Sequence, residues 1–467
     1  MFAKKSDESK EVNDQVEALR SANCLTYVSP SNIALVDRRV MKSYNFSSAV
    51  YPVLDSTTMQ ILVNSGSDSL WGPSSYLRFQ YIAGSSLDYG LGSVLNCFRS
   101  VRATHRSGEI LEYVENVNLI ANLRMFYEYS VSDFRKLQAV LGYGNDNTNF
   151  TNIVDPGIQV ACIPLSLLFG IFGNKDQYMP ASMCAGMKLE FEMAPNALVT
   201  VTGKTTPQIT NITPTLLLDS AQLYDVVNRE LLQEQADIDN SGIQFKYNTF
   251  FSTSALTNSS GVNIDVQQSA SLTNYVVAIT RDNNRVTSLL EGADAFNYIM
   301  PWGAGAQFRL GSLYYPQQIV KVDSTAATWN AVQFNAKEWY GLSLMAFQAY
   351  IAQFHKAAGN DANIKFQAGD QIADGTVASW VAGRACNAFS LEKSSCGIEL
   401  SGESTNNSRI LNLNATLAYT AGVSGAFPLS GTVNRAADYN LTTIRVDTFM
   451  NYVRVANLMG DNCVVDR

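Results

Sequence analysis

The stretch that decides the fold runs from Met187 to Met193 and reads MKLEFEM, with apolar and charged side chains in strict alternation. Successive side chains of a β-strand point to opposite faces of the sheet. The segment therefore places four apolar residues on one face and three charged residues on the other. This pattern predicts a strand of a sheet that is buried on one side.

Similar runs recur along most of the chain, separated by turn-rich patches such as NSGSDS, GNDNTN, NSSG and SGESTNNS. Many short strands between Gly, Asn and Ser loops are typical of β-sandwiches and barrels, so we expect a mostly β, all-β fold class with a few short helices. The further strands are expected at Thr58–Val63, Ser75–Ile82, Thr215–Val227, Ile243–Phe251, Tyr275–Thr280, Phe308–Tyr315, Ile410–Tyr419 and Thr443–Val455.

Helical spacing of apolar residues is confined to a few segments: the N-terminus, 131–141, 229–236 and 339–355. The charged stretch NRELLQEQADIDN lies close to the middle of the chain, between two strand-rich halves. It predicts a helical linker at 228–240 that joins two β domains, 25–227 and 241–467, with an N-terminal arm or helix at 1–24. The apolar run Ile158–Gly173 is shorter than the roughly 20 residues that span a bilayer, so we expect a buried strand followed by a short helix or loop.

The composition of the 467 residues predicts an unusually neutral surface. Hydrophobic residues make up 46% and charged residues 16%, with 33 Lys and Arg against 41 Asp and Glu. A soluble domain usually has ~25% charged residues, and charge is depleted at the centres of protein interfaces. The acidic balance argues against binding to the phosphate backbone of nucleic acids, which requires clustered basic residues.

Residues that could form a reactive or metal-binding centre are sparse. The seven cysteines include no CxxC pair, and the chain has only two histidines, His105 and His355. A tetrahedral metal site therefore lacks ligands at the usual spacings, no GxSxG motif is present, and Gly90-x-Gly92 lacks the third glycine of a dinucleotide-binding loop. We expect no catalytic, cofactor-binding or metal-binding residues, and no cofactor.

Two further patterns have both a functional and a structural interpretation. Glu190 and Glu192 share a strand face, as the paired carboxylates of some β-sandwich glycosidases do, but plain alternation of charge on a solvated face explains them better. Trp71 and Trp302 each precede a glycine and could stack on a sugar, although packing at the end of a strand is the simpler explanation.

Several segments together resemble one protein family, the double jelly-roll major capsid proteins of icosahedral DNA viruses, in its branch related to polinton-like viruses and virophages. The similar segments are Ile163-Pro164-Leu165 with the following LLFGIFGNKDQYMPASMCAGMKLEFEM, Thr215–Val227 with Tyr224-Asp225, NRELLQEQADID, Phe308–Gln318, and the C-terminal IRVDTFMNYVRVANLMG with Asn451, Tyr452 and Arg454. They run in the family's order from roughly residue 50 to the C-terminus.

The resemblance implies two jelly-roll β-sandwiches side by side and no enzymatic activity. It implies a structural protein of the virion, assembled inside the host cell, whose homotrimer is a pseudo-hexameric capsomer that tiles an icosahedral shell. The implied partners are other copies of the chain, neighbouring capsomers, penton and minor capsid proteins, and a membrane beneath the shell in some particles. Two alternatives stay open: an all-β carbohydrate-binding adhesin, spike or fibre component, and a β-sandwich glycoside hydrolase.

The first 20 residues combine charge with a narrow apolar stripe of Val12, Val16 and Leu19 at helical spacing. The resemblance places this segment at the base of the capsomer. We expect it to become helical when it meets a partner under the shell.

Overall fold

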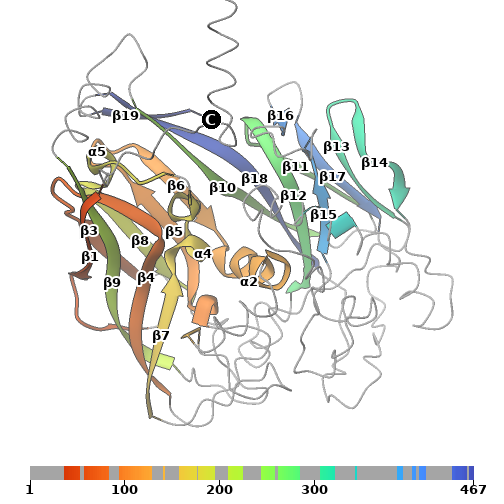
Figure 1. Cartoon of the computed structure of the whole chain (residues 1–467). Helices are drawn as coiled ribbons and strands as arrows, with labels where there is room; N and C mark the ends of the chain where they lie inside the picture. The colour runs from red at the N-terminus through yellow and green to blue at the C-terminus, as the bar shows by residue number, and fades with distance from the viewer. Residues whose placement is uncertain are drawn as a thin grey trace, which may run out of the picture.

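The computed structural model describes residues 36–52, 57–83, 94–128, 140–141, 157–175, 177–194, 209–224, 243–257, 261–283, 305–320, 342–343, 346, 386–392, 402–405, 410–416, 444–459 and 462–466. These residues form four antiparallel sheets, two in each half of the chain, as Figure 1 shows.

The first half of the chain builds a sandwich of two sheets. One sheet has the order β1 (Val36–Asn45), β9 (Ile209–Leu223), β4 (Ser69–Ala83) and β7 (Gly157–Pro164), with the short β2 (Tyr51–Pro52) beside β9. The facing sheet has the order β3 (Thr58–Val63), β8 (Met187–Met193), β5 (Phe98–Thr104) and β6 (Ile110–Glu115).

The second half repeats this arrangement. One sheet has the order β10 (Ile243–Thr257), β18 (Ile444–Met459), β12 (Ala270–Asp282) and β15 (Cys386–Ser390), with β16 (Glu403–Thr405) beside β12 and β19 (Asn462–Asp466) beside β18. The other has the order β11 (Gly261–Val266), β17 (Leu411–Thr416), β13 (Gly305–Leu310) and β14 (Leu313–Val320).

The strand order identifies both halves as jelly rolls. When the eight main described strands of each half are numbered along the chain, the two sheets read 1-8-3-6 and 2-7-4-5 in the first half and again in the second. This is the order of an eight-stranded sandwich built from two Greek keys. The predicted fold class is therefore confirmed. The exact domain boundaries and the 228–240 linker lie outside the described residues and stay predictions.

The alternation in MKLEFEM is reproduced residue by residue in β8. Its four apolar side chains are fully buried and its three charged side chains are not. Phe191 lies at the centre of the first core, where its ring meets those of Phe46, Phe98 and Phe169 at centroid distances of 5.5–6.0 Å. Burial of these aromatic rings between the two sheets supplies much of the driving force for folding.

One local prediction changes in the structure. The run Phe308–Tyr315 was expected as one strand, but it is a hairpin: β13 ends at Leu310 and β14 begins at Leu313. Gly311 makes the turn with a φ of 62°, a conformation that glycine adopts without steric cost. The sequence patterns also gave no sign of α2 (Val117–Glu128), the longest described helix.

The short segments η1 (Val94–Cys97), α4 (Leu165–Leu168), η2 (Gly170–Gly173) and α5 (Ala181–Cys184) complete the first half. The order β7, α4, η2 confirms the expectation of a strand and a short helix over Ile158–Gly173, although β7 is buried on one face only, with Val160 44% exposed. Of the helices expected elsewhere, only residues 140–141, 342–343 and 346 are described, and the segments at 1–20 and 229–236 lie outside the described residues.

Candidate functional site: the junction of the two sandwiches

His105 is a buried structural residue at the turn between β5 and β6. It is 3% exposed, with Nδ1 2.8 Å from Ser107 Oγ and Nε2 3.1 Å from the Ser182 carbonyl oxygen. Both ring nitrogens thus have polar partners, Ser107 in the same turn and Ser182 in the neighbouring α5. A histidine bonded in this way holds a loop in place. His355, Trp302, Gly90 and Gly92 lie outside the described residues.

The carboxylates of β8 belong to a charged outer sheet face. Glu190 lies 2.7 Å from the Lys188 ammonium and 3.9 Å from the Arg102 guanidinium. Glu192 instead accepts a hydrogen bond of 2.6 Å from Ser100 Oγ and lies 3.9 Å from Arg99. Each carboxylate has its own cationic partner, as expected of a solvated, salt-bridged face.

Trp71 packs against another aromatic ring. Its ring centroid lies 4.7 Å from that of Tyr178, and its side chain is partly buried. This contact supports the expectation of a packing anchor at a strand. Within the described part of the chain, no group of three or more His, Cys, Asp or Glu residues is placed to hold a metal ion.

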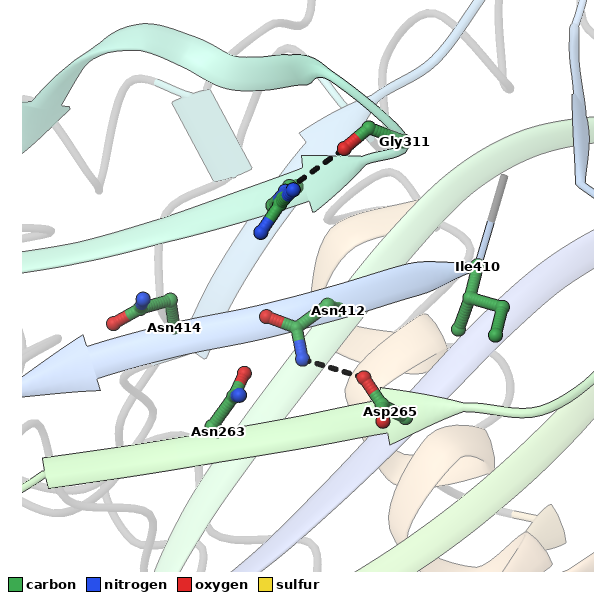
Figure 2. Close-up of a pocket in the computed structure, with 7 residues that line it drawn as sticks. Asn263, Asp265, Gly311, Ile410, Asn412 and Asn414 are labelled. Atoms are coloured by element: carbon green, nitrogen blue, oxygen red, sulfur yellow. Dashed lines mark hydrogen bonds between the residues drawn. The ribbon is translucent and has the colours of Figure 1, made fainter. Parts of the chain in front are cut away.

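A polar pocket of about 270 Å³ lies on the outer face of the sheet that contains β11, β17 and β13 (Figure 2). Three of its seven lining residues are asparagines. Asn412 Nδ2 donates to Asp265 Oδ1 at 2.6 Å, and Arg309 Nε donates to the Gly311 carbonyl at 2.8 Å. The pocket brings together no nucleophile and base, so it offers hydrogen bonding but no evident catalytic step. It is lined by Asn263, Asp265, Arg309, Gly311, Ile410, Asn412 and Asn414.

A buried polar network joins the two sandwiches. Strand β6 of the first packs against β10 of the second, and η2 lies against β10 as well. At Leu111 the pairing of β5 with β6 shifts register, and the Leu111 carbonyl accepts hydrogen bonds from the Tyr247 hydroxyl and from Arg454 Nη1, the latter at 2.7 Å. A bulge leaves backbone groups outside the sheet ladder, and here the freed carbonyl binds the neighbouring sandwich.

Glu112 is the centre of this junction. Its carboxylate is fully buried and accepts three hydrogen bonds, from Gly170 N at 2.8 Å, Ile171 N at 3.0 Å and Thr249 Oγ1 at 2.6 Å. Burial raises the pKa of Glu112, and the three donors together with Arg454 offset part of that rise. One side chain of β6 thus binds both η2 of its own sandwich and β10 of the other.

Close backbone approach completes the contact. A Cβ atom at Gly170 would lie 1.6 Å from the Asn248 carbonyl oxygen, so only glycine fits there. Asn174 extends the same contact by donating from Nδ2 to the Lys246 carbonyl at 2.8 Å.

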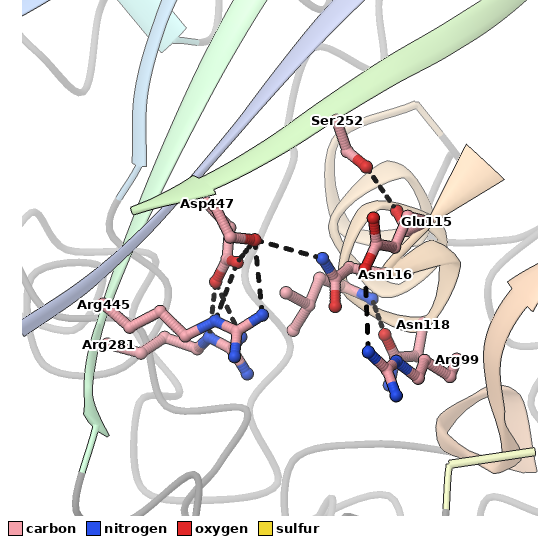
Figure 3. Close-up of polar contacts among 10 residues, drawn as sticks. Arg99, Glu115, Asn116, Asn118, Ser252, Arg281, Arg445 and Asp447 are labelled. Carbon is pink, nitrogen blue, oxygen red and sulfur yellow. Dashed lines mark hydrogen bonds and ion pairs between the residues drawn. The ribbon is translucent and has the colours of Figure 1, made fainter. Parts of the chain in front are cut away.

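A second buried cluster lies farther along β10 and is shown in Figure 3. Asp447 of β18 is fully buried, 2.6 Å from Arg281 Nη2 and 3.0 Å from Arg445 Nε, and it accepts a 2.5 Å hydrogen bond from Ser254 Oγ. Burial alone would raise the pKa of Asp447, but the two guanidinium groups outweigh burial and hold it below its usual range. Asn116 of the first sandwich donates to Ser254 Oγ at 3.3 Å, which connects the cluster to the junction.

Among the residues that carried the sequence resemblance, Arg454 lies at this junction, whereas Asn451 binds within the second sandwich. Asn451 accepts from Asn274 Nδ2 at 2.9 Å and donates to the Thr249 carbonyl, and Arg454 binds Leu111 as described above. Glu112 and Asp447 were not singled out from the sequence. The available signal was an acidic residue between apolar neighbours of a strand, Glu112 in ILEYVE and Asp447 in IRVDTFM.

No helix among the described residues is long and apolar enough to cross a membrane. No protein-family model matches the sequence, and no curated protein matches it.

Solved structures share the fold over nearly the whole chain. PBCV-1 VP54, fitted into a reconstruction of the virophage Sputnik, superposes with a TM-score of 0.61 at 10% identity and covers 95% of this chain and 100% of its own. The PBCV-1 virus capsid model superposes with a TM-score of 0.60 at 12% identity. The match covers 95% of this chain and 100% of the other. The Faustovirus major capsid protein superposes with a TM-score of 0.54 at 8% identity. The match covers 97% of this chain and 98% of the other. At such low identity, the likeness establishes the fold.

Proposed function

From a double jelly-roll fold that spans almost the full length of viral capsid proteins, we propose that this chain is the structural major capsid protein of an icosahedral DNA virus. The observation that carries the proposal is the repeated strand order 1-8-3-6 and 2-7-4-5 in both halves of the chain, together with the matches to PBCV-1 and Faustovirus proteins over 95% and 97% of its length. Its location would then be the shell of the virion.

The composition supports a protein that tiles a surface. A shell subunit meets copies of itself on several sides, and charged residues are depleted at the centres of such contacts. The chain has 16% charged residues, well below the ~25% of an ordinary soluble domain. Asn, Ser and Thr are abundant in turn-rich patches of the sequence such as NSGSDS, GNDNTN and SGESTNNS, as expected where polar surfaces must remain soluble before assembly.

The repeat also suggests how copies combine. Each chain holds two similar sandwiches fastened by buried polar contacts through Glu112 and Leu111. Three chains in a closed ring would place six sandwiches around one axis, which is a pseudo-hexameric capsomer with threefold symmetry. In this proposal the further partners are neighbouring capsomers, penton proteins, and minor capsid proteins or a membrane beneath the shell. The segment 1–20 would contact these inner partners.

The mass of the purified chain in solution tests the trimer. Light scattering coupled to size exclusion should give three times 51.1 kDa across a tenfold range of concentration, because subunits of a capsomer form a permanent interface. A mass of 51.1 kDa throughout that range would contradict the proposed capsomer. Deleting residues 1–20 serves as a second test: it should leave the trimer mass unchanged and lower the yield of closed particles.

A further inference from the structure

We propose that the polar pocket on the outer face of the sheet that contains β11, β17 and β13 binds a neutral sugar ring. This function goes beyond the proposed structural role and does not depend on it, because every residue that lines the pocket belongs to the second half of one chain. The proposal is carried by the side chains that the strand register brings together, and by a difference from a similar row of residues in the first sandwich.

The register of four strands aligns one residue from each in a single row across the sheet: Asp265 of β11, Asn412 of β17, Arg309 of β13 and Tyr314 of β14. Residues directly opposite each other on neighbouring antiparallel strands lie on the same face. Two positions further along these strands, Asn263 lies opposite Asn414 on that face. The row therefore places a carboxylate and a guanidinium on either side of an amide.

The first sandwich has a row of the same construction, but its charges neutralise one another. On the same four strands of the jelly roll stand Gln60 of β3, Glu190 of β8, Arg102 of β5 and Tyr113 of β6. Arg102 lies 3.9 Å from Glu190 on the adjacent strand, and Lys188 lies 2.7 Å from the same carboxylate. The charged groups of this row are therefore already paired within the sheet.

The row of the second sandwich leaves its two charges apart. The residue opposite Arg309 is Asn412, and the carboxylate lies one strand further away, at Asp265. Within the described part of the chain, no carboxylate forms an ion pair with Arg309. The pocket thus contains one positive and one negative charge, which favours a neutral ligand over a free cation or a free anion.

The polar groups of the pocket are held in position by bonds within the sheet. Arg309 Nε donates to the Gly311 carbonyl at 2.8 Å, and the guanidinium carbon lies 5.7 Å from the centre of the Tyr314 ring, a cation–π contact. Asn412 is only 9% exposed between its exposed neighbours, and its amide donates to Asp265 at 2.6 Å. Groups that are fixed in advance lose little conformational entropy when a ligand binds.

These groups match the chemistry of a sugar ring. A hydroxyl both donates and accepts hydrogen bonds, so it needs acceptors such as the Asp265 carboxylate and donors such as the Arg309 guanidinium. The amides of Asn263 and Asn414 supply both. Ile410 lies beside these polar groups, as Figure 2 shows, and its 41% exposed side chain offers an apolar contact for the C–H groups of the ring. The volume of about 270 Å³ is just below the ~300–1,000 Å³ of sites for drug-sized ligands, which suits one ring.

Saturation-transfer NMR on the purified full-length chain tests the site. The probes are the methyl glycosides of glucose, galactose, mannose, fucose and N-acetylglucosamine at millimolar concentration. Glycine is the competing probe, because its ammonium and carboxylate would pair with Asp265 and Arg309 without any need for the amides. We expect saturation transfer to at least one glycoside and a weaker signal, or none, for glycine. No transfer to any glycoside, or a glycine signal that equals or exceeds every glycoside signal, would overturn the proposal.

Matched arginine variants locate the binding. Arg309→Gln removes the guanidinium of the pocket, and Arg102→Gln removes the arginine of the similar row in the first sandwich. Both side chains are exposed, so neither change disturbs a core, and circular dichroism checks that each variant is folded. Because Arg309 donates charged hydrogen bonds, its replacement should weaken glycoside binding about tenfold or more, whereas Arg102→Gln should leave it unchanged. Equal effects of the two variants would mean that the sugar does not bind in this pocket.

A second change in the pocket covers the case in which Arg309→Gln does not fold. Asp265→Asn keeps an oxygen that accepts from Asn412 and removes only the charge, so the sheet is preserved while glycoside binding weakens. Unchanged binding by this variant would overturn the proposal. The mass of the chain is not part of these measurements. A monomer that binds a glycoside in the pocket would contradict the proposed capsomer alone, and a trimer that binds none would contradict the sugar site alone.

Discussion

Replacing Glu112 with alanine removes the acceptor that fastens the two sandwiches. The carboxylate is fully buried and binds Gly170 N, Ile171 N and Thr249 Oγ1 at 2.6–3.0 Å. A buried donor left without an acceptor costs about 1–3 kcal/mol, so three such donors set a range of about 3–9 kcal/mol. Two effects reduce this cost. Water can enter the vacated space and bind the donors, and the folded variant no longer has to bury a carboxylate. We expect about 3–5 kcal/mol of destabilisation, the usual cost of removing one partner from a buried charged network.

Urea denaturation at fixed protein concentration measures this loss, since assembly makes stability depend on concentration. The matched control is Glu115→Ala in the same strand. The Glu115 side chain is 40% exposed and lies 3.7 Å from Arg99, so its loss should cost only about 0–1 kcal/mol. Equal, small effects of the two substitutions would refute the account of Glu112 as the fastening residue of the junction.

Three further changes have definite expected outcomes. Gly170→Ala should separate the sandwiches, seen as faster proteolysis between them, because its Cβ would lie 1.6 Å from the Asn248 carbonyl oxygen; an unchanged digestion rate would contradict this. Asp447→Asn should destabilise by about 3–5 kcal/mol at neutral pH, because the buried Arg281 and the partly buried Arg445 lose their counter-ion. Since the folded-state pKa of Asp447 is lowered, its contribution is present above the ordinary value of 3.8 and is lost as the pH falls toward the lowered value, so urea melts of wild type and variant should converge in acid; a constant difference would argue against the ion pairs. Phe191→Ala should cost about 3–5 kcal/mol in the same melts, and a loss below 1 kcal/mol would mean that the ring is not central to the core.

The sequence predicted several strands that have one buried and one solvated face, but it missed β11, which alternates in the same way. Strand β3 begins and ends at the expected residues, Thr58 and Val63, and β8 shows the expected alternation without exception. In such strands apolar and polar side chains alternate along the sequence with a period of two, which identifies the strand.

Hydrophobic periodicity failed to predict elements that are buried on more than one face. Helix α2 is buried around most of its circumference, with Leu119, Ile120, Ala121 and Leu123 all at most 1% exposed. Its polar residues Asn118 and Asn122 are buried as well, so the helix lacks the contrast between a polar outer face and an apolar inner face that reveals a helical period. The hairpin at Gly311 was missed because apolar residues continue on both sides of a two-residue turn.

The junction could be predicted only in part. Asn451 and Arg454 drew attention through the family resemblance, whereas Glu112 and Asp447 did not. Their partners lie far away along the chain: Thr249 is 137 residues from Glu112, and Arg281 is 166 residues from Asp447. Spacing within a short motif carries no information about such pairs, so only the folded arrangement of the two sandwiches reveals them.

Electron-microscopy class averages of the purified chain, viewed along the symmetry axis of its particles, test the central claim most directly. The account predicts six lobes of similar size around one axis, with threefold symmetry, because each of three chains contributes two jelly rolls of the same strand order. Isolated two-lobed particles at all concentrations would contradict it.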